Sequence, residues 1–258
     1  MRTALLVLFY LLVVVLGSPF ILFCVLAGRR DPVLSYGLWA MRVSRRILAI
    51  RVDVSGIEHA DPASSRIYMP NHASLLDGPL MMMLIPGRPR VILKKSILRL
   101  PIVGAAMRFI GFVPVDRKGA RSGKRSIERA AALMRQRGYS FLIFPEGTRT
   151  FDGRLGPFRR GGFFMALETG APIVPVTILG SRELMPKGRP YARRGRISVV
   201  FHEPVPAEGQ GPEAVSALMA RVRAAILSAH DLGGRERTGP DVRPAAGAAA
   251  GRTAGGEA

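Results

Sequence analysis

A histidine and an aspartate stand five positions apart in the segment Asn71–Asp77. Five residues of helix turn through about 500°, so His72 and Asp77 cannot share one face of a regular helix. They can meet if His72 lies in a loop and Asp77 lies near the start of the next helix. A carboxylate in that place would hold the imidazole in one tautomer and stabilise it after it takes a proton. The spacing therefore indicates a general base with its orienting group.

The same two residues also have a purely structural interpretation. Asp77 precedes Gly78 and Pro79, and proline is favoured in a first helical turn, so Asp77 fits an ordinary N-cap. His72 would then be a hydrogen-bonded histidine at a corner between a strand and a helix. The pair alone leaves both interpretations open.

A second candidate site is the hexapeptide Phe144–Arg149, which follows an apolar run. Gly147 permits a tight backbone turn, Thr148 offers a hydroxyl, and Arg149 carries a guanidinium suited to phosphate. An ordinary turn with a surface arginine is the alternative.

Short apolar runs alternate with helical segments from residue 50 onward, and these elements have to position the two sites. The expected strands are 50–54, 67–69, 91–93, 112–115, 141–144, 173–178 and 197–201. The expected helices lie near 79–85, 97–109, 122–137, 160–169 and 213–231. This alternation predicts an α/β fold with a mixed, partly parallel sheet flanked by helices. The segment 233–258 has no apolar periodicity, and we expect it to be a disordered tail.

The net charge of +20 restricts the class of partner. Such a surface attracts nucleic acid, anionic lipid, or an acidic or phosphorylated partner. Aromatic residues are few and no nucleic-acid motif is present, so we do not expect nucleic acid. The single cysteine, Cys24, excludes a disulfide framework, and the four histidines are not spaced as metal ligands.

The segment Thr3–Ala27 contains no charged residue and would measure roughly 37 Å as a helix. A membrane-spanning anchor is the first interpretation. Gly17, Ser18 and Pro19 interrupt the segment and are expected to kink or break a helix, which makes a re-entrant or monotopic helical hairpin the alternative. Basic residues follow from Arg29 onward, so we expect the rest of the chain on the cytoplasmic face.

The segment 31–49 separates apolar from basic residues at helical spacing. Trp39 lies among the apolar residues, while Arg42, Arg45 and Arg46 group on another side. This pattern is typical of an interfacial helix with an aromatic anchor and a basic face for lipid phosphates. A helix packed on the core with one solvated edge is the alternative.

Four ordered blocks carry a resemblance to a known family. They are Asn71-His72-x4-Asp77, Gly111–Arg117, Phe144–Arg149 and Ile173–Val176, with Lys94-Lys95-Ser96, Pro101 and Gly104 between the first two. In this order and spacing they resemble the glycerolipid acyltransferases, the lysophosphatidic acid acyltransferases in particular. The resemblance spans roughly residues 50–205. It makes 50–232 the expected acyltransferase domain, preceded by an anchor or hairpin arm, 1–30, and the interfacial helix 31–49.

The resemblance implies a reaction and a role for each residue. His72 would deprotonate the free hydroxyl of a lysophospholipid, with Asp77 as its orienter, and the hydroxyl would attack an acyl thioester directly. The implied acceptor is 1-acylglycerol-3-phosphate, the product phosphatidic acid, and the donor acyl carrier protein or coenzyme A carrying the acyl group. Glu146 would position its turn or bond the glycerol. The implied substrate contacts are Asn71, Lys94, Arg117, Glu146, Gly147, Thr148 and Arg149; no metal or cofactor is implied.

Three alternatives remain at this point. The acceptor could be another lysophospholipid or an acylated amino-acid lipid. A lipid hydrolase could use the same His–Asp pair if water took the place of the acceptor hydroxyl. A non-enzymatic binder of anionic lipid or nucleic acid would explain the charge but not the four blocks.

Overall fold

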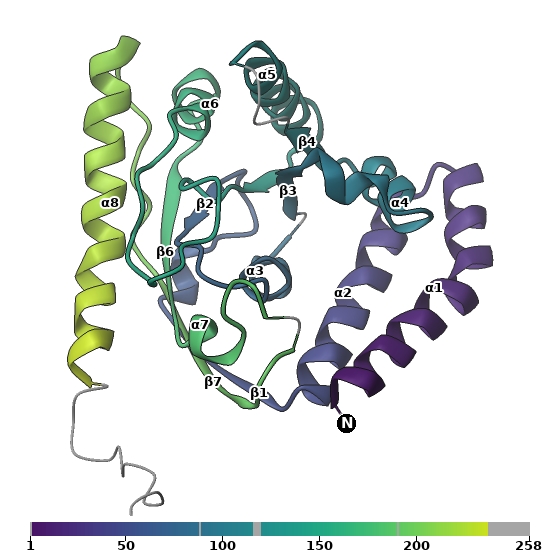
Figure 1. The fold of residues 1–258 in the computed structure, drawn as a ribbon. Coiled ribbons are helices and arrows are strands. Elements are labelled where there is room, and N and C mark those ends of the chain that lie inside the picture. Colours follow the sequence, from purple (N-terminus) through teal and green to yellow (C-terminus); the bar gives the residue numbers. More distant parts are fainter. Residues whose placement is uncertain (1, 88, 116–119, 190, 237–258) are drawn as a thin grey trace, which may run out of the picture.

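A seven-stranded mixed sheet forms the centre of the protein within the described residues, which are 2–87, 89–115, 120–189 and 191–236 of the computed structural model (Figure 1). The strands are β1 (Ile50–Ser55), β2 (Ile67–Pro70), β3 (Pro89–Lys94), β4 (Val113–Val115), β5 (Ser140–Leu142), β6 (Ile173–Leu179) and β7 (Gly195–Phe201). Their order is β1-β7-β6-β2-β5-β3-β4. Strands β2 to β6 run parallel to one another, and β7 is antiparallel to β6 and parallel to β1. The predicted mixed sheet is confirmed.

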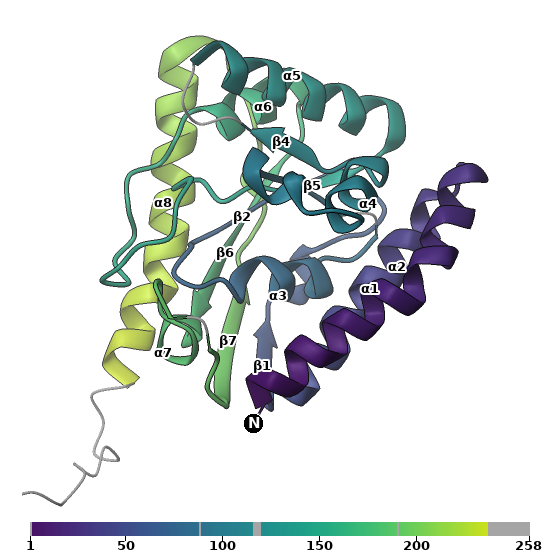
Figure 2. The ribbon, with the colours of Figure 1, turned by 45° about the vertical axis from the view of Figure 1, so that its right-hand side comes forward.

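Helices cover both faces of this sheet (Figures 1 and 2). The α-helices are α1 (Arg2–Leu26), α2 (Arg30–Ile47), α3 (Asp77–Leu84), α4 (Val103–Phe109), α5 (Ala120–Arg137), α6 (Gly161–Thr169), α7 (Ser181–Leu184) and α8 (Gly211–Glu236), and the short 3-10 helices are η1 (Ile57–His59) and η2 (Lys95–Arg99). One core joins α2, α3 and α4 to one face, and the other joins α5, α6 and α8 to the opposite face.

Side chains alternate between the two cores along the central strand. In β2, Ile67 and Met69 enter the core with α5, α6 and α8, whereas Tyr68 enters the core with α3. Successive side chains of a strand point to opposite faces, so a strand buried on both faces has to be apolar throughout. Strand β2 is fully buried, and this explains why it contains no charged residue.

The carboxyl ends of β2, β5, β3 and β4 meet at one edge of the sheet, because these neighbouring strands are parallel. Loops that follow the strands at such an edge are where open α/β sheets bind ligands. The loop after β2 carries His72, the loop after β5 carries Glu146 to Arg149, and Lys94 ends β3. The topology thus brings blocks that are distant in sequence to the same edge.

Helices α1 and α2 form an antiparallel hairpin that packs beside the sheet, with α8 on the far side of the molecule (Figure 1). The aromatic rings of Tyr36 and Trp39 stack at 5.6 Å, and Phe9 contacts Trp39. The buried Arg90 at the start of β3 lies 3.6 Å from Asp31 at the start of α2. Both the core and this ion pair fix the hairpin to the sheet.

Of the kink or break predicted at Gly17, Ser18 and Pro19, the break was wrong. Helix α1 continues through Pro19, and the chain reverses only between Leu26 and Arg30. Proline cannot donate to the carbonyl four residues earlier, which is that of Val15. The Ser18 hydroxyl donates to this oxygen instead, at 2.9 Å.

Two other boundaries differ from the sequence prediction. The single helix expected over 97–109 is two pieces, η2 and α4, separated by Pro101 and by Ile102 with a φ of 59°. Helix α8 continues to Glu236, beyond residue 233 where the tail was expected to begin. The rest of that tail lies outside the described residues.

Candidate active site

His72 and Asp77 meet as the spacing required. His72 lies in the loop after β2, and Asp77 is the first residue of α3. Their side chains are joined by the 2.9 Å contact between Nδ1 and Oδ2. A carboxylate can only accept, so Nδ1 carries the proton and Nε2 is left with its lone pair. The imidazole also stacks on the Phe144 ring, with centroids 3.9 Å apart. One ring nitrogen of a partly exposed histidine is therefore available for chemistry.

Asp77 organises the whole loop as well as the imidazole. Its Oδ2 also accepts hydrogen bonds from the backbone amides of Ala73 and Ser74, at 2.8 and 2.7 Å. Leu76, not Asp77, precedes the helix as the N-cap, and Asp77 bonds amides before the helix rather than inside it. The carboxylate is fully buried, and its Oδ1 has no hydrogen-bond partner among the described residues. The N-cap interpretation was wrong, although Asp77 does fix the loop.

Glu146 is buried and connects the loop of His72 to the segment that contains Gly156. Its Oε1 accepts from the backbone amide of His72 at 2.7 Å, and its Oε2 accepts from the amide of Gly156 at 2.8 Å. Burial raises the pKa of the Glu146 carboxyl, and the amides of Gly156 and His72 partly oppose that rise. Both oxygens of Glu146 accept from backbone amides, so Glu146 positions the loop that carries His72, and nothing in this geometry offers it to the glycerol.

The turn after β5 has bonded backbone amides but leaves two polar side chains, those of Thr148 and Arg149, without a hydrogen bond to other described residues. The amide of Gly147 closes the turn on the carbonyl of Phe144 at 3.0 Å, and Gly147 has a φ of 70°, which favours glycine. Thr148 is exposed, and the half-buried Arg149 makes no side-chain hydrogen bond or ion pair to any other described residue. The amide of Thr150 donates to the carbonyl of His72 at 2.9 Å. Arg149, whose guanidinium has no partner within the described part of the chain, is thus next to a residue bonded to the His72 backbone.

Asn71 has a different place from the one expected. Its amide oxygen accepts from the amide of Ile178 at 2.7 Å, and its Nδ2 donates to the carbonyl of the same residue at 3.0 Å. Asn71 is buried and joins the end of β2 to β6. The side chain predicted to contact substrate therefore serves to align two strands.

The two remaining predicted residues come from neighbouring strands. Lys94 is exposed at the carboxyl end of β3, on the same edge of the sheet as His72. Arg117 lies outside the described residues; the strand before it, β4, ends at Val115 beside β3. Within the described ranges, no group of three or more His, Cys, Asp or Glu side chains is placed to hold a metal ion.

Two residues of the site were missed at the sequence level. Phe144 supplies the ring under His72, and Ser74, fully buried, donates from its hydroxyl to the carbonyl of Met185 at 2.8 Å. Both lie inside the recognised blocks. Their partners are fixed by the tertiary fold, so no local pattern shows them.

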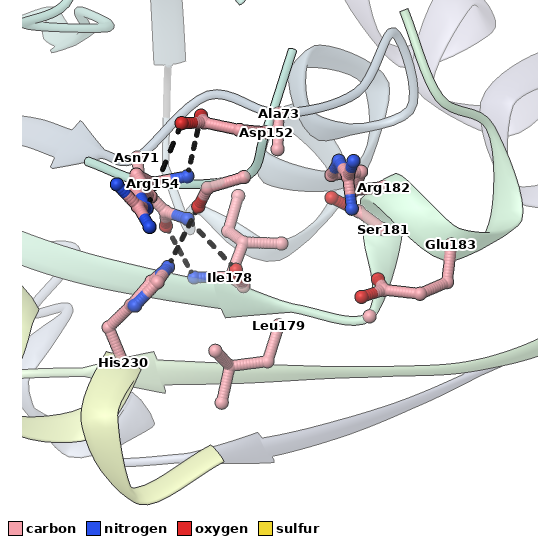
Figure 3. Close-up of a pocket in the computed structure, with 12 residues that line it drawn as sticks. Asn71, Ala73, Asp152, Arg154, Ile178, Leu179, Ser181, Arg182, Glu183 and His230 are labelled. Carbon is pink, nitrogen blue, oxygen red and sulfur yellow. Dashed lines mark hydrogen bonds and ion pairs between the residues drawn. The ribbon is translucent and has the colours of Figure 1, made fainter. Parts of the chain in front are cut away.

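Two cavities flank the loop that carries His72, residues 71–76. A polar cavity of about 180 Å³ lies on one side, between the loop and the end of α8 (Figure 3). Its lining includes Asn71, Ala73, Arg154, Ser181, Arg182 and His230. An apolar cavity of about 200 Å³ lies between α3 and the hairpin and is lined by Leu75 and Leu76 of the loop. His72 is not among the residues that line either cavity, although its sequence neighbours Asn71 and Ala73 line the polar cavity.

Comparison with known proteins supports this arrangement. The acyltransferase family model matches residues 51–179. The chloroplastic 1-acyl-sn-glycerol-3-phosphate acyltransferase BAT2 of Brassica napus is 37% identical over 158 residues, which are 60% of this chain and 45% of that protein. The human 1-acyl-sn-glycerol-3-phosphate acyltransferase alpha is 33% identical over 182 residues, or 70% of this chain and 64% of that protein. The chain thus spans about half to two thirds of the length of these curated relatives.

A solved structure matches over nearly the whole chain. The crystal structure of the 1-acyl-sn-glycerophosphate acyltransferase PlsC from Thermotoga maritima superposes with a TM-score of 0.74 at 28% identity. The match covers 92% of this chain and 98% of that one. Fold and family model therefore agree over residues 51–179, which include strands β2 to β6 and the loops that carry His72, Asp77 and Glu146. The chain belongs to the acyltransferase family.

Proposed function

We propose that this protein transfers a fatty acyl group from a thioester to the sn-2 hydroxyl of 1-acylglycerol-3-phosphate, which gives phosphatidic acid. The observation that carries the proposal is the 2.9 Å contact between His72 Nδ1 and the buried carboxylate of Asp77. This contact leaves Nε2 of His72 free to act as a base, at the edge of the sheet where the loops after β2 and β5 meet. The names of the relatives from Brassica napus, human and Thermotoga maritima support the acceptor.

The reaction needs one base and no covalent intermediate. His72 Nε2 takes the proton of the acceptor hydroxyl as its oxygen attacks the thioester carbonyl carbon. The carbon–sulfur bond then breaks, and the imidazolium returns the proton to the departing thiolate. Asp77 stabilises the imidazolium in between. Arg149 is proposed to bind the acceptor phosphate, since its guanidinium has no hydrogen-bond or ion-pair partner among the described residues, and Arg117 to assist it. Lys94 is proposed to meet the oxyanion or a phosphate.

The apolar cavity supplies a place for the acyl chain. Leu75 and Leu76 belong to the loop between the base and its orienter, and they line this cavity together with Leu80 of α3 and Leu6 of α1. Burying methylene groups is worth about 0.8 kcal/mol each. We propose that an acyl chain enters here from the side of the hairpin.

The hairpin is proposed to lie in one leaflet of the membrane rather than to cross it. Helix α1 is long and apolar enough to span a bilayer, and most of its surface is exposed. However, it packs along α2, which carries Arg42, Arg45 and Arg46 and also contacts α3. A spanning α1 would draw these charges to bilayer depth, at a cost of about 2.5–3.5 kcal/mol for each one at the centre. The basic residues after the hairpin favour the cytoplasmic face.

The test is acyl transfer by the purified protein in detergent micelles. A panel of lysophospholipids is offered with acyl carrier protein or coenzyme A as the carrier of the acyl group. We expect phosphatidic acid from 1-acylglycerol-3-phosphate, and a fall in kcat of about 10²–10⁴-fold in His72→Ala. His59→Ala, in η1, is the matched control and should keep full activity. Free fatty acid without acceptor would indicate a hydrolase, and His72→Ala within tenfold of the wild type would exclude this mechanism.

A further inference from the structure

Residues 185–189 touch both loops of the active site. They follow α7 and lie beyond residue 179, where the family match ends. Pro186 forms a bridge with Ser74 of the His–Asp loop, beside the bond from the Ser74 hydroxyl to Met185. The next residue, Lys187, turns to the other loop, the turn after β5. Two consecutive residues thus contact the two halves of the site.

Lys187 is held on that turn by two contacts. Its Nζ donates to the carbonyl oxygen of Arg149 at 2.8 Å, and it lies 3.7 Å from the centroid of the Phe151 ring. A hydrogen bond from an ammonium is roughly twice as strong as one between neutral groups. The side chain is half-buried, which limits screening of the interaction by water.

The bonded carbonyl belongs to the peptide group that also holds the catalytic loop. The carbonyl of Arg149 and the amide of Thr150 are the two ends of one peptide group. The carbonyl accepts from Lys187, and the amide donates to the carbonyl of His72 at 2.9 Å. A peptide group polarised at its oxygen is a stronger donor at its nitrogen. The Arg149–Thr150 peptide group therefore links the ammonium of Lys187 to the backbone carbonyl of His72.

We propose that Lys187 is a positioning residue for acceptor binding, a role that rests on the proposed function. It fixes the orientation of the Arg149–Thr150 peptide group. The guanidinium of Arg149, which leaves the same residue, is thereby aimed at the acceptor phosphate while the turn stays bonded to His72. Lys187 acts through these groups and does not itself touch the reacting atoms.

The experiment compares three variants of the full chain in detergent micelles. Lys187→Met keeps the length of the side chain and removes the donor; Lys187→Arg keeps a charged donor. Arg189→Met removes a neighbouring exposed cation, which contacts Tyr191 and not the turn. We expect Lys187→Met to raise KM for 1-acylglycerol-3-phosphate about tenfold with a smaller change in kcat. Lys187→Arg should restore KM to within about threefold, and Arg189→Met should match the wild type.

A second readout does not depend on turnover. Hydrogen exchange of the Thr150 amide, followed by mass spectrometry, should be faster in Lys187→Met than in the two other variants. If the wild type transfers no acyl group, the proposed function fails, and this comparison alone decides whether Lys187 holds the turn. Unchanged exchange in Lys187→Met overturns the proposal. An unchanged KM in an active Lys187→Met enzyme also overturns the proposal, even if its melting temperature and kcat both fall.

Discussion

At the scale of single residues, the carboxylate of Asp77 combines two tasks that a substitution can separate. Its Oδ2 accepts from two loop amides and from His72. Asp77→Asn keeps an oxygen for these donors but removes the charge that stabilises the imidazolium. We therefore expect kcat to fall about 10²–10⁴-fold, while the free energy of unfolding falls by only about 1–3 kcal/mol, because a buried NH₂ replaces Oδ1. Steady-state kinetics and thermal unfolding measure the two effects.

The control for Asp77→Asn is circular dichroism at the assay temperature, which should show the wild-type spectrum. A kcat within threefold of the wild type would mean that the charge of Asp77 is not needed in the transition state.

The difference between what was and was not predicted at this scale follows from distance along the chain. The contact between His72 and Asp77 lies within one short segment, so spacing alone indicated it. The bond from the His72 amide to Glu146 joins residues 74 positions apart, and those between Asn71 and Ile178 join residues 107 positions apart. Such partners are decided by which strands lie side by side. The sequence placed Glu146 and Asn71 in the site, but only the fold shows that both brace it.

At the scale of elements, local sequence predicted the strands of the sheet correctly but predicted wrongly that α1 could break at Gly17 to Pro19. All seven strands were predicted, because β1 alternates apolar with polar residues and the others are short runs rich in apolar residues. The break at Gly17 to Pro19 was predicted from rules that hold for an isolated helix. In the hairpin, α1 packs against α2 at this point. The Tyr36 hydroxyl of α2 lies against Gly17 and donates to the carbonyl of Val13 at 2.8 Å.

This packing predicts opposite effects for one substitution at two glycines of the hairpin. A Cβ on Gly17 would overlap the ring of Tyr36, whereas a Cβ on Gly37 would meet nothing within 4 Å. Alanine in an open helical position stabilises by about 0.5–1 kcal/mol, and overpacking costs about 1–3 kcal/mol. We expect Gly17→Ala to lower the melting temperature in micelles and Gly37→Ala to leave it unchanged or raise it. Equal shifts for both would contradict the close approach of the two helices.

At the scale of the whole molecule, the proposed function requires the hairpin, the basic surface and the site to act at one membrane surface. The exposed cations Arg42 and Arg46 lie on α2, next to the apolar surface of α1. Each cation near an anionic surface contributes about 1 kcal/mol, and this attraction is screened within about 3 Å at 1 M salt. We expect binding to anionic vesicles to weaken with salt, while the apolar hairpin maintains a residual binding to neutral vesicles.

A pair of double variants locates this attraction on the molecule. Replacing Arg42 and Arg46 by Gln should weaken binding to anionic vesicles about 10–30-fold at low salt, measured by co-sedimentation. Replacing the exposed Lys124 and Arg125 by Gln removes the same charge from α5, whose core lies on the opposite face of the sheet from that of α2. This control should bind almost as the wild type does, because α5 packs on the face of the sheet opposite to the hairpin. Equal losses in both would mean that net charge, and not the face beside α1, sets the orientation of the active site on the membrane.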